Sequence, residues 1–106
     1  MLGIPENLSV QGKAAVEVIM KRVRADQADP VGLEQAFCSA QDWADRGERY
    51  GLESELIIIH DGGDLGPYFS YDRENYNAIE KMDKDLHEIG MYAQQCTRWY
   101  TAVYKL

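Results

Sequence analysis

Four consecutive large aliphatic residues, Leu56–Ile59, constrain the fold of this chain more than any other stretch. A strand with one wet face alternates apolar and polar side chains, and this run does not alternate. We therefore expect a strand over 55–60 that lies centrally in a sheet or is covered on both faces. After the Gly62-Gly63 turn, the aromatic stretch 66–71 reads as a second strand, which predicts a hairpin.

The apolar spacing near the start of the chain predicts a helix at about 9–25. Asn7 or Ser9 can cap this helix, because a short polar side chain can accept a hydrogen bond from a free amide of the first turn. Gly12 weakens the prediction, and a strand pair that turns at Gly12-Lys13 is the alternative interpretation.

Two further helices are predicted. Asp29-Pro30 is a start signal for a helix that runs to about Arg49, with Gly51 as its left-handed stop. Another helix at about 73–89 is capped by Asp72 and ends at Gly90.

The last segment, 91–106, holds one or two strands, at about 92–95 and 98–105. The element order is then helix, helix, strand, strand, helix, and a final strand or hairpin. This order predicts one α+β domain over 1–106, in which a small, mainly antiparallel sheet of three or four strands packs against three helices. A chain of 106 residues suits a single domain of this size.

The net charge of −7 is concentrated in one region, since residues 32–64 contain eight acids and two arginines, a balance of −6. Such a surface repels nucleic acids and anionic membranes, and it is compatible with a basic protein partner. No apolar run approaches the roughly 20 residues that span a bilayer, and no leader is visible, so we expect a cytoplasmic protein. The spacing of Cys38 and Cys96 fits no zinc or redox motif. We expect two buried thiols, and a disulfide between them is the alternative.

The segment His60-Asp61-Gly62-Gly63-Asp64 is the one cluster that suggests chemistry, and His87 can complete it. Imidazole and carboxylate groups bind metals or ligands and move protons. A plain turn explains the same residues, because aspartate and glycine dominate tight turns. No known metal or phosphate-binding motif is present, so we expect no metal, no cofactor and no catalytic set, and treat His60, Asp61, Asp64 and His87 as a ligand-binding alternative.

Asp83 and His87 are four residues apart and would share one face of a helix. A carboxylate in this position can orient an imidazole for base catalysis. No nucleophile accompanies them in the sequence, so a pair at the rim of the core is the simpler interpretation.

Aromatic residues are the distinctive feature of the second half, since eight of the eleven follow residue 64. Tyrosine and tryptophan bury large areas while keeping a polar atom, so they serve both cores and interfaces. A core that simply contains these rings is the competing explanation. The predicted interface combines aromatic and acidic residues: Tyr68, Tyr71, Trp99, Tyr100, Tyr104, Asp42, Asp45 and Glu48.

These observations favour a small acidic, non-enzymatic protein that binds a protein partner, or itself, through an acidic helix and a tyrosine-rich sheet. Small size, acidity and the lack of a complete catalytic set are shared by many inhibitors and adaptors, including phage-encoded ones. The alternative is a small enzyme or a metal- or ligand-binding domain with its site at the His60 turn.

Overall fold

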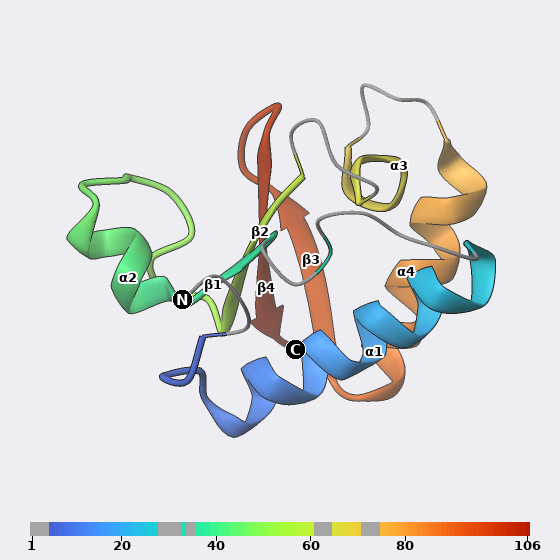
Figure 1. Cartoon of the computed structure of the whole chain (residues 1–106), viewed down its shortest axis with the longest axis horizontal. Coiled ribbons are helices and arrows are strands. Elements are labelled where there is room, and N and C mark those ends of the chain that lie inside the picture. Colours follow the sequence, from blue (N-terminus) through green and yellow to red (C-terminus); the bar gives the residue numbers. More distant parts are fainter. Residues whose placement is uncertain (1–4, 28–32, 34–35, 61–64, 71–74) are drawn as a thin grey trace.

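The structure is a computed structural model that describes residues 5–27, 33, 36–60, 65–70 and 75–106. It confirms the predicted α+β class, with helices on both sides of one antiparallel sheet (Figure 1). In chain order the elements are α1 (Val10–Asp26), β1 (Phe37–Cys38), α2 (Ala40–Asp45), β2 (Leu56–Ile59), α3 (Gly66–Phe69), α4 (Tyr76–Glu88), β3 (Met91–Gln95) and β4 (Tyr100–Lys105).

The sheet has the strand order β1-β2-β4-β3, and all its neighbours are antiparallel. β2 lies between β1 and β4, with Ile57 opposite both Cys38 and Ala102. The central position predicted for the aliphatic strand is therefore confirmed. For the last segment, predicted as a strand or a hairpin, the structure has the hairpin: β3 and β4 pair in a register from Met91↔Lys105 to Gln95↔Thr101.

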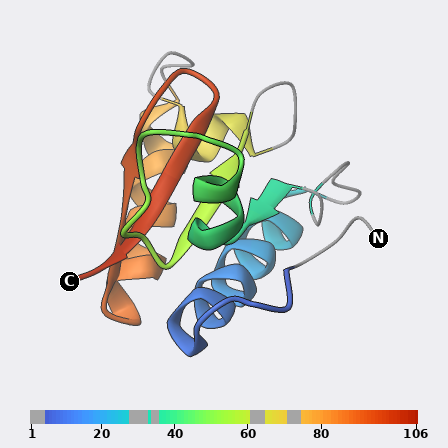
Figure 2. The ribbon, with the colours of Figure 1, turned by 90° about the vertical axis from the view of Figure 1, so that its left-hand side faces the viewer.

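The two faces of the sheet differ in their cover. We call the first the helix face; its side chains pack against α1, α3 and α4, and they are Leu56, Ile58, Met91, Ala93 and Val103. We call the other the aromatic face, and its side chains are Ile57, Ile59, Tyr92, Tyr100, Ala102 and Tyr104. Figure 2 shows that short α2 and the segment that follows it lie in front of the aromatic face.

α1 forms as predicted, and Ser9 is its cap. The Ser9 hydroxyl accepts a hydrogen bond from the Gly12 amide at 3.0 Å and donates one to the Glu55 carboxylate at 2.7 Å. A Cβ atom at Gly12 would overlap the backbone oxygen of Glu55. Glycine therefore permits the close approach of α1 to the start of β2, which answers the doubt that Gly12 raised about this helix.

α4 begins later than predicted. Asn75 is its cap, with the side-chain oxygen 3.4 Å from the Ala78 amide, whereas the predicted cap Asp72 lies outside the described residues. The helix ends just before Gly90, which has the left-handed φ of 76° expected of a residue that terminates a helix.

The predicted helix up to Arg49 is correct only over α2, Ala40–Asp45, and the described residues on either side of it differ. Phe37 and Cys38 form β1 instead, because they pair with Ile58 and Ile57 across the sheet. Ser39 then begins a new six-residue helix, since its hydroxyl accepts the Asp42 amide at 3.1 Å. Long-range strand pairing overrides the local helical pattern here.

The second predicted strand, 66–71, is also wrong over 66–70, the part that the structure describes. Gly66–Phe69 is the short helix α3, with Pro67 in its first turn, a position where proline needs no amide partner. β2 pairs with β1 and β4, so no hairpin joins it to this segment. The predicted turn residues 61–64 lie outside the described residues.

Gly51 has a left-handed φ of 81° as predicted, but α2 has already ended at Asp45. A Cβ atom at Gly51 would lie 2.8 Å from Ile57 Cδ1 and 3.0 Å from the Ala102 Cβ atom. The backbone at Gly51 therefore rests directly on the aromatic face.

Cys38 and Cys96 are both free thiols, and both are half-buried beside the aromatic face. Burial raises the pKa of each thiol, so neither is poised as a thiolate. Among the helices of the described residues, none is both long and apolar enough to cross a membrane.

Candidate functional site

His60 follows β2 and lies in the core on the helix-face side of the sheet, with 2% of its surface exposed. Its Nε2 atom is 3.0 Å from the Thr101 hydroxyl, and its ring is nearly parallel to Phe69, at an angle of 20° with centroids 6.3 Å apart. Its backbone amide donates to the Trp99 carbonyl at 2.9 Å. These contacts account for a buried imidazole as part of the core.

His87 lies on the exposed side of α4. Its Nδ1 atom is 2.6 Å from the backbone carbonyl of Asp83, so Nδ1 is the donor. The predicted Asp83–His87 pair therefore meets through the main chain, while burial raises the pKa of the Asp83 carboxyl and His87 opposes that shift.

The four residues of the ligand-binding alternative do not form a described site. Asp61 and Asp64 lie outside the described residues, and no contact within the described part joins His60 to His87. Within the same residues, no three His, Cys, Asp or Glu side chains are close enough to hold a metal ion.

The aromatic face contains a cluster of three rings, Trp43, Trp99 and Tyr100. Ring centroids are 5.5 Å apart for the two tryptophans and 4.9 and 4.8 Å from each of them to Tyr100. The rings meet at tilted or edge-on angles, which match the aromatic quadrupole. Trp43 and Tyr100 are 0% and 1% exposed, while Trp99 is half-buried, so the cluster reaches the surface at Trp99.

α2 positions Trp43 over the sheet. Its first turn is held by the Ser39 cap, and its exposed side carries Asp42 and Asp45. Asn7 donates to the Asp42 carboxylate at 3.3 Å, which ties the helix to the segment before α1. The guanidinium of Arg46 lies 4.5 Å from the centre of the Trp43 ring, a cation–π distance.

A pocket of about 270 Å³ opens beside the cluster, where the segment after α2 meets the β3–β4 turn. Its walls combine aromatic rings with charged groups, and the lining residues are Gly47, Glu48, Arg49, Tyr50, Thr97, Trp99 and Tyr100. Tyr50, one of these lining residues, is 58% exposed.

Two polar groups of the aromatic cluster, the Tyr100 hydroxyl and the Trp43 ring nitrogen, are buried. Burial raises the pKa of the Tyr100 hydroxyl, and the nearby Trp43 side chain opposes the shift. Nε1 of Trp43 does not reach hydrogen-bond geometry, and it is the one buried side-chain nitrogen or oxygen of the described chain without a partner.

Tyr92 and Tyr104 form a second aromatic contact on the same face. Their rings stack at 24° with centroids 5.4 Å apart, and both are half-buried. Burial raises the pKa of Tyr104. This pair extends the partly exposed aromatic area from the pocket along the β3–β4 hairpin.

Six of the eight predicted interface residues lie on or beside the aromatic face. Trp99, Tyr100 and Glu48 meet at the pocket, with Asp42 and Asp45 on the adjoining helix. Tyr104 lies further along the same face.

The other two predicted interface residues are not on this face. Tyr68 is in α3 rather than in a strand; it is 4% exposed, and its hydroxyl donates to Asp26 at 2.9 Å. Tyr71 lies outside the described residues.

Sequence reasoning missed Trp43, Tyr50 and Tyr92 as members of this surface. The alternation in β3 could have placed Tyr92 beside Tyr104, given the hairpin. No sequence signal pairs Trp43 with Trp99, since they come from different elements that the sheet register brings together.

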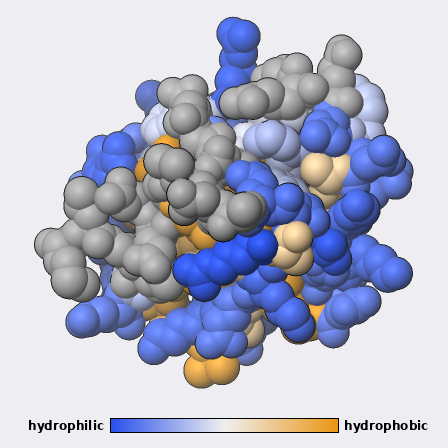
Figure 3. Space-filling view, turned by 45° about the vertical axis from the view of Figure 1, so that its right-hand side comes forward, coloured by the Kyte–Doolittle hydropathy of each residue, from blue (hydrophilic) through white to orange (hydrophobic). Residues whose placement is uncertain are grey.

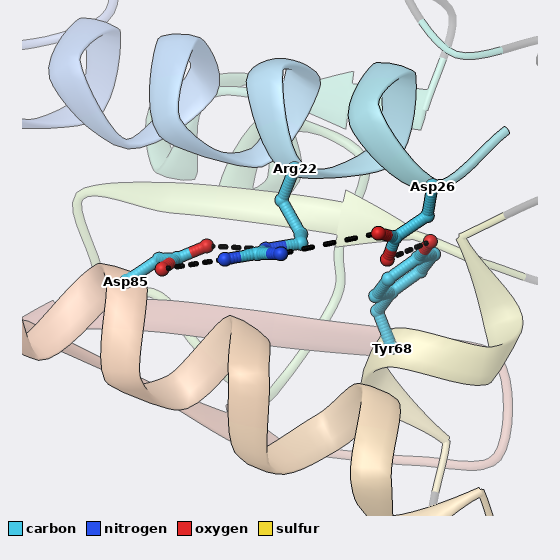
Figure 4. Close-up of polar contacts among 4 residues, drawn as sticks. All are labelled: Arg22, Asp26, Tyr68 and Asp85. Carbon is cyan, nitrogen blue, oxygen red and sulfur yellow. Dashed lines mark hydrogen bonds and ion pairs between the residues drawn. The ribbon is translucent and has the colours of Figure 1, made fainter. Parts of the chain in front are cut away.

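On the opposite side of the molecule, a polar network joins α1, α4 and α3 (Figure 4). Arg22 donates two hydrogen bonds to the Asp85 carboxylate, at 2.6 and 3.1 Å, and lies 3.9 Å from Asp26, which accepts from Tyr68. Asp85 is half-buried in this network.

A groove of about 250 Å³ lies over this network between α1 and α4, with Lys21 and Arg22 facing Asp85 and Glu88. Figure 3 shows mostly hydrophilic side chains on this side, with small and separated apolar areas. Arg22 and Asp85 of this groove already bond to each other, so the groove offers less to a partner than the aromatic face.

Comparison of the chain with protein-family models, with curated proteins and with solved structures gives no match. The residues of the chain itself therefore carry the functional argument.

Proposed function

We propose that this chain is a non-enzymatic interaction protein, of the inhibitor or adaptor type, that binds a basic protein partner with its aromatic face. The pocket lined by Tyr50, Trp99 and Tyr100 beside the Glu48 carboxylate carries the proposal. Aromatic walls with an adjacent carboxylate attract lysine and arginine side chains through cation–π and ionic interactions. A volume of about 270 Å³ suits one such side chain.

The position of Arg46 supports this preference for cations. Its guanidinium already lies 4.5 Å from the Trp43 ring, so the cluster holds an arginine of the chain itself on its outer side. Arg49, which also lines the pocket, partly offsets the charge of Glu48. The rings are therefore the main attraction, and charge adds to them.

The surrounding charge favours a basic partner. Residues 36–60 contain five acids and two arginines, a balance of −3. Asp42 and Asp45 are exposed on α2, next to the pocket. Such a field raises the association rate of a basic surface, and salt screens it.

The alternative function, an enzyme or ligand-binding domain built on His60, receives no support from the described residues. Among the described residues, His60 is 2% exposed and contacts Thr101 and Phe69. A catalytic imidazole must reach the proton that it transfers.

Two exposed tyrosines provide a matched test. Tyr50 is 58% exposed at the pocket, and Tyr76 is 54% exposed at the start of α4. The chain is immobilised, bound proteins are identified by mass spectrometry, and the dissociation constant of the purified partner is measured for wild type, Tyr50→Ala and Tyr76→Ala. We expect Tyr50→Ala to weaken binding about tenfold or more, as for an interface anchor, and Tyr76→Ala to bind like wild type.

Salt provides a second measurement on the same complex. We expect the association rate to fall as salt is raised, and Asp42→Lys with Asp45→Lys to remove most of that dependence. Equal binding by Tyr50→Ala and wild type, or a partner that binds without regard to salt, would contradict the proposal.

A further inference from the structure

The sheet ends in two unlike edges. β1 contributes two residues to one edge, whereas β3 contributes five to the other. In Figure 2, β3 is the outermost strand on its side of the sheet. An edge strand presents a row of backbone donors and acceptors to any other strand that approaches it.

β3 lacks the usual features that protect an edge. Its sequence, Met-Tyr-Ala-Gln-Gln, contains no charged residue and no proline. Its register with β4 is unbroken from Met91 to Gln95, so no bulge twists it away. Natural edge strands usually carry lysine, proline or a bulge that discourages pairing.

The backbone of β3 has a defined outward side. Cys96 donates to the Tyr100 carbonyl at 3.1 Å, and Leu106 donates to the Gly90 carbonyl at 2.9 Å. Because bonded pairs alternate in an antiparallel ladder, residues 92 and 94 bond to β4. The amides and carbonyls of residues 91, 93 and 95 therefore point away from β4, towards the outer edge of the sheet.

This pattern is complementary to itself. If a second β3 lies antiparallel with a two-fold axis at Ala93, residue 93 faces its own copy and residue 91 faces residue 95. All these residues have outward-pointing groups, so each of the three pairs can exchange two hydrogen bonds, about six in all. A strand without charge also meets its copy without local repulsion.

We propose that two copies of this chain pair through β3 and form one continuous eight-stranded antiparallel sheet. Residues that face each other across antiparallel strands point to the same side. The two aromatic faces therefore become one surface, with Tyr92 of each copy opposite Gln94 of the other. This inference rests on the sheet edge alone and does not depend on the basic partner.

Sedimentation equilibrium over about three decades of concentration tests the pairing. We expect wild type to pass from monomer to dimer, and dimerisation to strengthen with salt because each copy carries a net charge of −7. Binding of a basic partner should instead weaken with salt. The opposite salt dependences distinguish a failure of the dimer proposal from a failure of the partner-binding proposal.

Ala93→Pro is the disrupting variant, since the amide at 93 points outward and takes no part in the β3–β4 ladder. We expect a monomer with the far-ultraviolet circular dichroism of wild type. A wild type that stays monomeric throughout, an edge that takes up an extended peptide but not its own copy, or an Ala93→Pro chain that is folded and still dimeric would overturn the proposal.

Cross-linking tests the register even if Ala93→Pro fails to fold. Directly bonded antiparallel residues have Cα atoms about 5.5 Å apart, which is within disulfide range. We expect Ala93→Cys to give a covalent dimer under mild oxidation. Gln94→Cys should give none, because residue 94 faces residue 92 of the other copy. Equal cross-linking of both variants would refute the two-fold axis at Ala93.

Discussion

The helix face and the aromatic face belong to the same four strands, yet they are built in different ways. The helix face is covered by α1, α3 and α4 and encloses fully buried aliphatic side chains such as Leu56 and Ile58. The aromatic face is covered by one six-residue helix and a loop, and its rings remain partly exposed. We expect the first face to supply most of the stability, whereas the second leaves aromatic area partly exposed.

The largest expected difference between the faces concerns two adjacent isoleucines of β2. Ile58 is fully buried on the helix face, and Ile59 is half-buried on the aromatic face. We expect Ile58→Ala to lower the free energy of unfolding by about 2–5 kcal/mol, and Ile59→Ala by less than half of that loss. Urea denaturation measures both, and equal losses would show that the aromatic face is as well packed as the helix face.

Two left-handed glycines test how closely the loop packs on the aromatic face. Gly47 and Gly51 have φ angles of 85° and 81°, but only Gly51 has atoms within contact range of an added Cβ. We expect Gly47→Ala to cost about 1–2 kcal/mol from backbone strain alone. Gly51→Ala should cost measurably more in thermal or urea unfolding, because Ile57 and Ala102 must also move; similar costs would mean that the loop is loosely held.

A smaller difference in unfolding free energy is expected between two arginines, Arg22 on the helix side of the sheet and Arg46 on the aromatic side. Arg22 makes a bidentate pair with Asp85 and has 28% of its side chain exposed, whereas Arg46 is exposed above Trp43. We expect Arg22→Met to cost about 1 kcal/mol, allowing for solvent screening, and Arg46→Met to cost less. Unfolding in urea at low and high salt checks the order, which would be reversed if the cation–π contact dominated.

The smallest effect is expected at alkaline pH. Burial raises the pKa of Tyr68 on the helix side, and of Tyr100 and Tyr104 on the aromatic face, above the ordinary value of 10.0. The unfolded chain loses these protons first, so the free energy of unfolding is unaffected below about pH 10 and falls as the pH rises through the raised values.

Two variants separate the contributions of the faces to this alkaline loss. Tyr68→Phe and Tyr100→Phe should each make the fall in unfolding free energy between pH 9 and about pH 11 smaller than in wild type. The comparison uses the change with pH, so the hydrogen bond from Tyr68 to Asp26 does not enter it at first order. An unchanged fall in both variants would assign the alkaline loss to other groups.

Local signals predicted the parts of the fold that local interactions decide. Ser9 and the apolar spacing after it located α1, and Gly90 located the end of α4. The aliphatic run located β2, because a strand covered on both faces has no polar side chain to place.

The errors came from segments whose partners are distant in the sequence. Phe37 and Cys38 fit a helical pattern, yet they pair with β2 about twenty residues later. Tyr68 and Phe69 have high strand propensity, yet they occupy a single helical turn whose side chains fill the core beneath His60 and beside Asp26.

The candidate site was only partly predictable for the same reason. Trp99 and Tyr100 could be recognised as aromatic residues of a strand end. Trp43 and Tyr50 reach them because α2 and the loop after it fold back over the sheet, and no spacing in the sequence specifies that return. The turn carboxylates Asp61 and Asp64 remain a prediction, as they lie outside the described residues.

The strand order also sets the time at which this domain can complete its fold. β2 bonds along its whole length to β4, and Ile57 pairs with Ala102, which is 45 residues later. The β3–β4 hairpin can form quickly from neighbouring residues, whereas closing the long loop between β2 and β4 is slow. During synthesis, β2 cannot pair with β4, and its aliphatic side chains are not fully covered, until β4 has left the ribosome. The most hydrophobic strand of the chain is therefore the one that is exposed longest to chaperones and to aggregation.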